Sequence, residues 1–186
     1  MNTFFAYFAA KGIGPDEIAS IAAAFQTKTL ERGSYFVEEG RTSKYIAFVS
    51  KGLFQYYYLV DGKETTTYVS GEGSFLASVQ SFFRQQPSRE NIRAITPAEI
   101  SCLHYDDLAR LKKDSPGFRS FYITALENLA VGMDATRTNL IILTAEERYA
   151  LMMKNEPALL QQVPLQYLAS ILGVTPRHLS RIRNNF

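Results

Sequence analysis

The residues best suited to binding chemistry lie near the C-terminus, where positive charge is concentrated. Residues 157–186 include Arg177, Arg181 and Arg183 but no aspartate or glutamate. A guanidinium can form forked hydrogen bonds to a guanine edge or to phosphate oxygens. The formal net charge of the 186-residue chain is only +2, so the chain as a whole is not a general polyanion binder. The local charge instead predicts that this segment binds nucleic acid.

Two short helices joined by a tight turn are predicted to position these arginines. Gly173 can supply the left-handed backbone of such a turn. Thr175 is a good N-cap, and Pro176 falls at the first helical position, where its missing N–H costs nothing. Apolar residues recur at helical spacing in both helices: Leu165, Leu168 and Leu172 in the first, Leu179 and Ile182 in the second. This pattern predicts a helix-turn-helix.

The second helix is predicted to enter the major groove of DNA. The predicted DNA-contacting residues are Leu165, Thr175, Arg177, His178, Ser180, Arg181 and Arg183. Arg177 and Arg181 are the first candidates for base recognition, because they lie in the first turns, and His178 and Ser180 are the second. The other three are predicted to contact phosphates. The alternative is two amphipathic helices with a solvated basic face, since arginine also suits a helix C-terminus.

The region from about Lys28 to Leu103 has the pattern of an antiparallel sandwich or barrel. Short β-prone runs at 35–37, 45–49, 53–60, 65–69, 92–95 and 100–103 alternate with turn signals. Asp61-Gly62 is the best hairpin turn, because both residues tolerate positive φ. A short helix with an apolar stripe is predicted before this region, and its stripe comprises Ile18, Ile21, Ala22 and Phe25.

A long helix is predicted to begin at Ser115-Pro116. Alternating spacings of three and four residues mark a coiled-coil seam along it, formed by Phe118, Tyr122, Ala125, Leu129, Gly132, Thr136 and Leu140. This seam predicts a homodimer. The alternative is a helix that packs on its own domain, which the small Ala125 and Gly132 also permit. A capping box at 144–147 begins the next helix.

Composition and motifs give little support for catalysis. A single cysteine, Cys102, excludes an intrachain disulfide and a cysteine cluster for metal, and is expected of a protein in the reducing cytoplasm. His104 adjoins two aspartates without a second imidazole, so it is predicted to be a polar residue at a strand end. Phosphate-loop, serine-elbow and dinucleotide motifs are absent from the sequence. We therefore predict no enzyme, no metal and no resident cofactor. The first ten residues predict neither a signal peptide nor a membrane span.

Local motifs follow one another in an order that is known from one family. They lie at 30–33 with 39–40, 45–53, 61–64, 143–149, 163–169 and 179–183. The set resembles the cyclic-AMP receptor/fumarate–nitrate regulator (Crp/Fnr) superfamily of bacterial transcription factors. The sequences of the motifs are most similar to those of short members typical of Bacteroidetes. The resemblance covers nearly the whole chain.

The resemblance implies an α+β protein with three parts. They are an N-terminal β-roll of the cyclic-nucleotide-binding type (a jelly roll) with flanking helices at 1–112, a dimerisation helix at 113–143 and a helix-turn-helix domain at 144–186. It also implies a homodimer that binds a pseudo-palindromic operator in double-stranded DNA, with RNA polymerase as a possible further partner.

The residues that would hold a cyclic nucleotide depart from the family pattern. In nucleotide-binding members, a glutamate holds the ribose 2′-hydroxyl and an arginine pairs with the cyclic phosphate. Ala77-Ser78-Val79 aligns with the family's Gly-Glu-Leu run, so the glutamate is absent, and Ser88 takes the arginine position with Arg89 one residue later. In a strand, that shift turns the side chain to the opposite face. Arg89 could still serve if it lies in the loop before Asn91, but Glu90 beside it would repel a phosphate. We therefore expect that cyclic AMP does not bind tightly.

Another small-molecule effector, or none, is expected in this pocket. The candidate lining residues are Phe75, Ser78, Phe82, Ser88, Arg89 and Asn91, with Met133 and Asp134 of the long helix as candidate caps from the dimer seam. Many family members continue into a β-wing, whereas this sequence closes with Asn184-Asn185-Phe186, so no phosphate contacts from a wing are expected. An alternative function is a ligand-sensing or protein-interaction β-roll with a weak or vestigial DNA-binding end.

Overall fold

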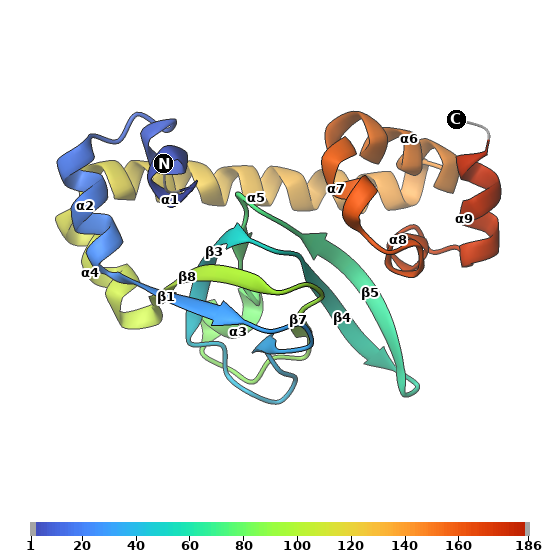
Figure 1. Cartoon of the computed structure of the whole chain (residues 1–186), viewed down its shortest axis with the longest axis horizontal. Helices are drawn as coiled ribbons and strands as arrows, with labels where there is room; N and C mark the ends of the chain where they lie inside the picture. Colours follow the sequence, from blue (N-terminus) through green and yellow to red (C-terminus); the bar gives the residue numbers. More distant parts are fainter. Residues whose placement is uncertain (1–2, 185–186) are drawn as a thin grey trace.

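A β-roll, a long helix and a C-terminal group of short helices follow one another in the computed structural model (Figure 1), which describes residues 3–184. The expectation about a missing wing rests partly on Asn185 and Phe186, which lie outside the described residues. The strands are β1 (Phe25–Leu30), β2 (Tyr35–Val37), β3 (Tyr45–Lys51), β4 (Phe54–Val60), β5 (Lys63–Ser70), β6 (Phe75–Leu76), β7 (Asn91–Ala94) and β8 (Ala98–His104). The helices are α1 (Thr3–Ala9), α2 (Pro15–Ala23), α3 (Val79–Arg84), α4 (Tyr105–Asp114), α5 (Pro116–Ile142), α6 (Ala145–Asn155), α7 (Pro157–Gln162), α8 (Leu165–Ile171) and α9 (Pro176–Arg183).

Two antiparallel four-stranded sheets form the roll. Their strand orders are β1-β8-β3-β6 and β2-β7-β4-β5. Inward-facing side chains of both sheets make a common core that includes Val49, Phe54, Ile92 and Ile100, as alternation along paired strands requires. The predicted hairpin turn is confirmed, because Asp61 and Gly62 have φ values of 51° and 73° between β4 and β5. The predicted apolar stripe is wrong at Phe25, which begins β1 because α2 ends at Ala23.

An aromatic cluster holds the helices against one end of the roll. Phe8 of α1, Phe48 of β3 and Phe118 of α5 are fully or almost fully buried in it. At the start of α5, Glu17 of α2 accepts hydrogen bonds from the Ser115 hydroxyl (2.5 Å) and the Gly117 amide (2.7 Å). These bonds satisfy donors at the helix terminus and fix the position from which α5 leaves the roll.

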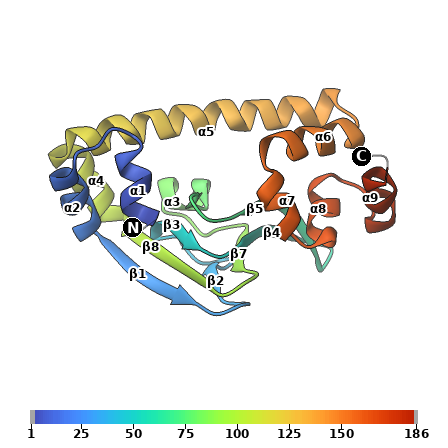
Figure 2. The same ribbon diagram turned by 45° about the horizontal axis from the view of Figure 1, so that its top comes forward.

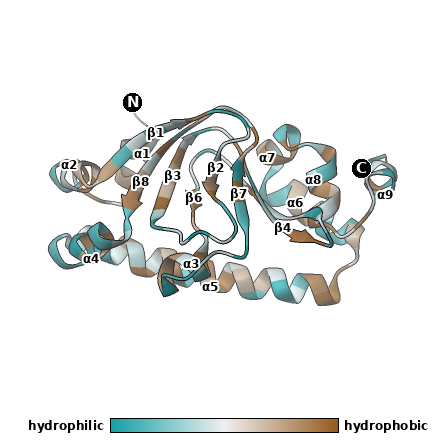
Figure 3. Cartoon of the chain, turned by 90° about the horizontal axis from the view of Figure 1, so that it is seen from below, coloured by the Kyte–Doolittle hydropathy of each residue, from teal (hydrophilic) through white to brown (hydrophobic). Residues whose placement is uncertain are grey.

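The long helix α5 begins at the predicted residue and extends beyond the roll toward the C-terminal helices (Figures 1 and 2). Phe118 must be removed from the predicted seam, because its side chain is only 1% exposed and belongs to the core of its own chain. Tyr122 is half-buried and stacks on Phe118. The helix exposes apolar residues further along, at Leu129 and Leu140, and Figure 3 shows hydrophobic (brown) segments among hydrophilic ones along it.

Candidate nucleic-acid interface and effector site

The local features predicted between α8 and α9 are present. The chain turns at Gly173, whose φ is +67°. Thr175 is the N-cap of α9, and its hydroxyl accepts a hydrogen bond from the His178 amide at 3.2 Å, with Pro176 at the first helical position. This cap satisfies one of the free N–H groups at the helix start. The two helices pack through five buried residues, Leu168, Ala169, Leu172, Leu179 and Ile182.

Packing of these apolar residues leaves the basic side of α9 in solvent. Arg177, Arg181 and Arg183 are exposed, and none of the three forms an ion pair with another residue in 3–184. Ser180 is also exposed, but its hydroxyl donates to the Pro176 carbonyl at 3.0 Å within the helix. The three guanidinium groups therefore have their donors available to an external anion or base edge.

Leu165 and Thr175 have local structural roles as well. Leu165 is the first residue of α8 and packs partly buried against the C-terminal core, so its backbone rather than its side chain could face a phosphate. Thr175 is exposed and uses its hydroxyl as the N-cap acceptor, which leaves the hydroxyl proton to donate elsewhere.

The C-terminal helices are fixed to the long helix and to the roll. Arg148 of α6 donates to the Leu143 carbonyl and to the Leu172 carbonyl, both at 2.7 Å, and so joins the end of α5 to the end of α8. On the other side, the Ser170 hydroxyl of α8 donates to the Thr66 carbonyl of β5 at 3.0 Å. Val69 of β5 is buried in the same apolar cluster as the C-terminal helices. Figure 2 shows these helices beside the β4–β5 hairpin.

The candidate effector residues separate into two groups. Ser78 and Ser88 meet inside the roll, with hydroxyl oxygens 3.0 Å apart, and both side chains are buried. The Asn91 side-chain oxygen accepts from the Glu39 amide at 2.9 Å and is buried as well. Phe75 and Phe82 instead pack in the aromatic cluster that faces the N-terminal helices, so their assignment to the pocket is corrected.

A carboxylate, Glu90, lies two residues after the position at which the pattern of a cyclic-nucleotide site has its arginine. Arg89 is exposed, whereas Glu90 is half-buried, with its carboxylate near the Ser78 and Tyr58 hydroxyls. Burial raises the pKa of Glu90, against the opposite influence of these two hydroxyls. The Ser88 hydroxyl already has an acceptor in the same segment, since it donates to the Glu90 backbone carbonyl at 2.8 Å. The negative charge of the Glu90 carboxylate therefore disfavours binding of a phosphate at this place.

The two candidate caps on α5 are solvent-exposed in the single chain. Met133 is 58% exposed. Asp134 forms a surface ion pair with Arg137 one turn later, at 2.8 Å. A cap from the dimer seam would act in the presence of a second copy, so the assignment of Met133 and Asp134 stays a prediction.

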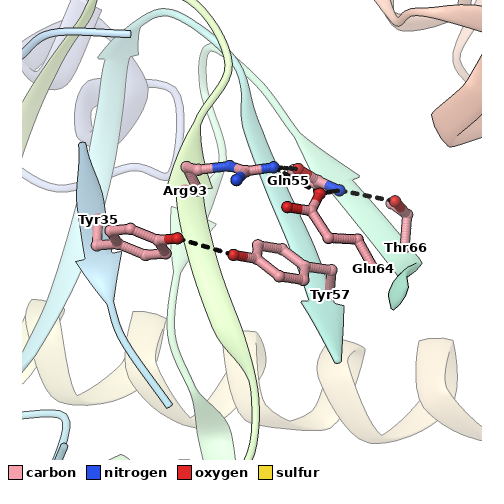
Figure 4. Close-up of polar contacts among 6 residues, drawn as sticks. All are labelled: Tyr35, Gln55, Tyr57, Glu64, Thr66 and Arg93. Atoms are coloured by element: carbon pink, nitrogen blue, oxygen red, sulfur yellow. Dashed lines mark hydrogen bonds and ion pairs between the residues drawn. The ribbon is translucent and has the colours of Figure 1, made fainter. Parts of the chain in front are cut away.

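A second arginine near this site was missed by the sequence analysis and belongs to a polar network (Figure 4). The network lies on the outer face of the second sheet and consists of Tyr35, Gln55, Tyr57, Glu64, Thr66 and Arg93. Arg93 donates to the Gln55 side chain at 2.9 Å and to Glu64 at 2.6 Å. Burial acts to lower the pKa of Arg93, but the Glu64 carboxylate raises it overall. Alternation with inward-facing Ile92 is the signal that could have placed Arg93 outside the roll. The positive charge of Arg93 is therefore paired with the Glu64 carboxylate of the same sheet.

His104 and Cys102, whose residue types suit catalysis or metal binding, have structural surroundings. Within residues 3–184, no three His, Cys, Asp or Glu side chains come together as metal ligands would. His104 ends β8, and its Nδ1 accepts from the Asp106 amide at 3.3 Å, which agrees with its predicted place at a strand end. Burial raises the pKa of Cys102 to about 11, which disfavours a reactive thiolate. No described helix is long and apolar enough to cross a membrane.

Residues 27–115 match the family model of the cyclic nucleotide-binding domain. This segment has the fold of that domain. The match covers the roll and α4 but not the C-terminal helices. A comparison with curated proteins finds no match.

Solved structures of bacterial regulators share the fold over most of the chain. The c-di-GMP-responsive global regulator CLP of Xanthomonas campestris is 16% identical, with a TM-score of 0.68 over 92% of this chain and 91% of that one. A CooA mutant from Carboxydothermus hydrogenoformans is 16% identical, with a TM-score of 0.69 over 90% and 78%. The Thermus thermophilus catabolite activator protein is 19% identical, with a TM-score of 0.54 over 94% and 84%. These chains are similar in fold to this one.

Proposed function

We propose that this protein is a homodimeric, sequence-specific transcription regulator of the Crp/Fnr type whose effector is not cyclic AMP. The observation that carries the proposal is the α8–α9 pair, in which a threonine-capped helix presents three unpaired, exposed arginines. The acid-free composition of this segment and the fold shared with bacterial regulators support it. Interaction with RNA polymerase and an origin in Bacteroidetes remain predictions of the sequence resemblance.

In this proposal, Arg177 and Arg181 contact base edges in the major groove, and Arg183 and the start of α8 contact phosphates. Two copies of α9, related by the dimer axis, bind successive major grooves about 34 Å apart, so the operator is a pseudo-palindrome. The long helix α5 sets this separation, because Arg148 joins its end to α8.

The proposed dimer seam differs from the one that the sequence indicated. Exposed apolar residues on α5 have the spacing of a seam at Leu126, Leu129, Met133 and Leu140, with Tyr122 and Thr136 completing the alternation. Leu126 and Met133 therefore replace Ala125 and Gly132. Ala125 is half-buried near α1, and Gly132 has no side chain with which to bury apolar surface in a seam. An unpartnered apolar row of this length on a helix supports association with a second copy.

The effector of the roll is proposed to be other than a cyclic mononucleotide. Ser88 already hydrogen-bonds to Ser78 and to the Glu90 carbonyl, and the Glu90 carboxylate would repel a phosphate. CLP responds to c-di-GMP, so a member of this fold with a different ligand exists. For this chain we propose no specific effector.

The DNA-binding proposal is tested by selecting binding sites from a randomised duplex library and measuring mobility shifts over a range of salt concentrations. Arg181→Ala is expected to cost about 1–3 kcal/mol on the selected site and to relax preference at one base pair. Arg119→Ala, which removes an exposed arginine from α5, is the control and should bind normally. Equal weakening on all sequences would refute base recognition by Arg181. If the wild type shifts no DNA at any salt concentration, the proposed function is wrong.

A further inference from the structure

A carboxylate from α6 lies beside the exposed face of α9. The Glu146 side chain, in the first turn of α6, is 3.3 Å from Nε2 of His178, in the first turn of α9. The two residues are 32 positions apart in the sequence, and their side chains are 47% and 51% exposed. The contact is therefore made by the packing of two helices, and solvent still reaches the imidazole.

Glu146 is not required for the cap of its own helix. That role belongs to Glu147, whose carboxylate accepts from the Thr144 amide at 2.8 Å and completes the capping box. The His178 backbone is held separately, since its amide donates to the Thr175 hydroxyl. The ring of His178 is thus positioned at both its backbone and its Nε2 atom.

The chemistry of this contact determines which nitrogen of His178 carries the proton. An ionised carboxylate only accepts hydrogen bonds, so Nε2 must donate. In the neutral imidazole, Nδ1 is then left as an acceptor. In the major groove, only the N6 amino group of adenine and the N4 amino group of cytosine are donors. An imidazole held in this tautomer can therefore distinguish adenine and cytosine from guanine and thymine.

We infer that Glu146 is a positioning residue of the DNA-reading surface, which orients His178 and fixes its tautomer so that Nδ1 accepts from adenine or cytosine. The inference rests on the proposed DNA-binding function and assigns a role to a residue outside the helix-turn-helix. It also implies a cost, because a carboxylate near the backbone of DNA repels phosphates. The Glu146–His178 pair therefore lowers the affinity for DNA in general and raises the selectivity for one base of the binding site.

The test uses the full chain and in vitro selection from a randomised duplex library. Wild type, Glu146→Gln, Glu146→Ala and His178→Ala are compared, with Glu127→Gln on the exposed face of α5 as the matched control. The wild type should show one position in each half-site that prefers adenine or cytosine. Direct binding to the selected duplex and to single-base variants then measures the preference.

Glu146→Gln is the decisive variant. An amide can accept from or donate to Nε2, so the contact survives while the tautomer is no longer imposed. We expect the preference at that position to fall about tenfold in Glu146→Gln and Glu146→Ala and to disappear in His178→Ala. Binding to non-specific DNA should become tighter in both Glu146 variants, and Glu127→Gln should behave as wild type.

The outcomes separate the inference from the function on which it rests. A purely structural contact would leave the preference of Glu146→Gln unchanged, and that result overturns the inference while DNA binding stands. A preference for guanine or thymine at the position that His178→Ala abolishes would also overturn it. If no duplex is enriched by the wild type, DNA binding itself has failed.

Discussion

Leu129→Glu should separate the two copies of the proposed dimer without unfolding the protomer. Leu129 lies in the middle of the exposed apolar row of α5 and is 39% exposed in the single chain. The substitution therefore leaves the core of the protomer intact. Its effect should appear only when a second copy is present.

The size of the effect follows from the remaining exposed surface. Complete burial of a leucine side chain contributes about 1.5–3 kcal/mol, so covering the 39% that is still exposed contributes about 1 kcal/mol in each protomer. Loss of this contact in both copies removes about 2 kcal/mol, and two carboxylates facing each other across the seam add a cost of similar size at most. A total of about 2–4 kcal/mol corresponds to a dissociation constant weakened by about thirtyfold to a thousandfold.

Sedimentation velocity over a range of protein concentrations measures this change. Val131→Glu is the matched control, because Val131 is 69% exposed on the same helix but lies off the seam. The control should dimerise like the wild type, and both variants should unfold at a similar temperature when monomeric. Equal effects of the two substitutions, or a Leu129→Glu dimer of unchanged affinity, would refute the proposed seam.

Two further changes address the same helix and the effector site. Gly132→Ala should stabilise the protein by about 0.8–1 kcal/mol in urea unfolding, because glycine is a poor helix former and the new methyl group meets no atom; a weakened dimer would return Gly132 to the contact surface. Glu90→Gln should raise the thermal unfolding temperature at pH 7, because burial raises the folded-state pKa of Glu90 above its unfolded value. The wild type gains this stability as the pH falls through the folded-state pKa and has it fully below the unfolded value, so the advantage of the glutamine variant should vanish there. An advantage that persists at low pH would contradict this cause.

Local sequence signals determined several parts of this protein before any tertiary contact was known. Gly173, Thr175 and Pro176 specify a turn, a cap and a helix start within four residues, and the backbone adopts that geometry. Asp61-Gly62 likewise determines the hairpin. Such features depend on the conformational preferences of neighbouring residues and on short-range hydrogen bonds, so the sequence alone contains them.

Long-range packing decided what those signals left open. The spacing on α5 allowed two rows of residues, and the exposed fractions of Leu126, Met133 and Leu140 in the folded chain distinguish between them. The contact of Glu146 with His178 joins residues 32 positions apart, and no local preference encodes it. Glu90 was visible in the sequence, but its carboxylate meets Ser78 and Tyr58 only because separate strands fold together. The sequence thus determined which elements form, whereas tertiary packing decided which of their faces remain free to bind.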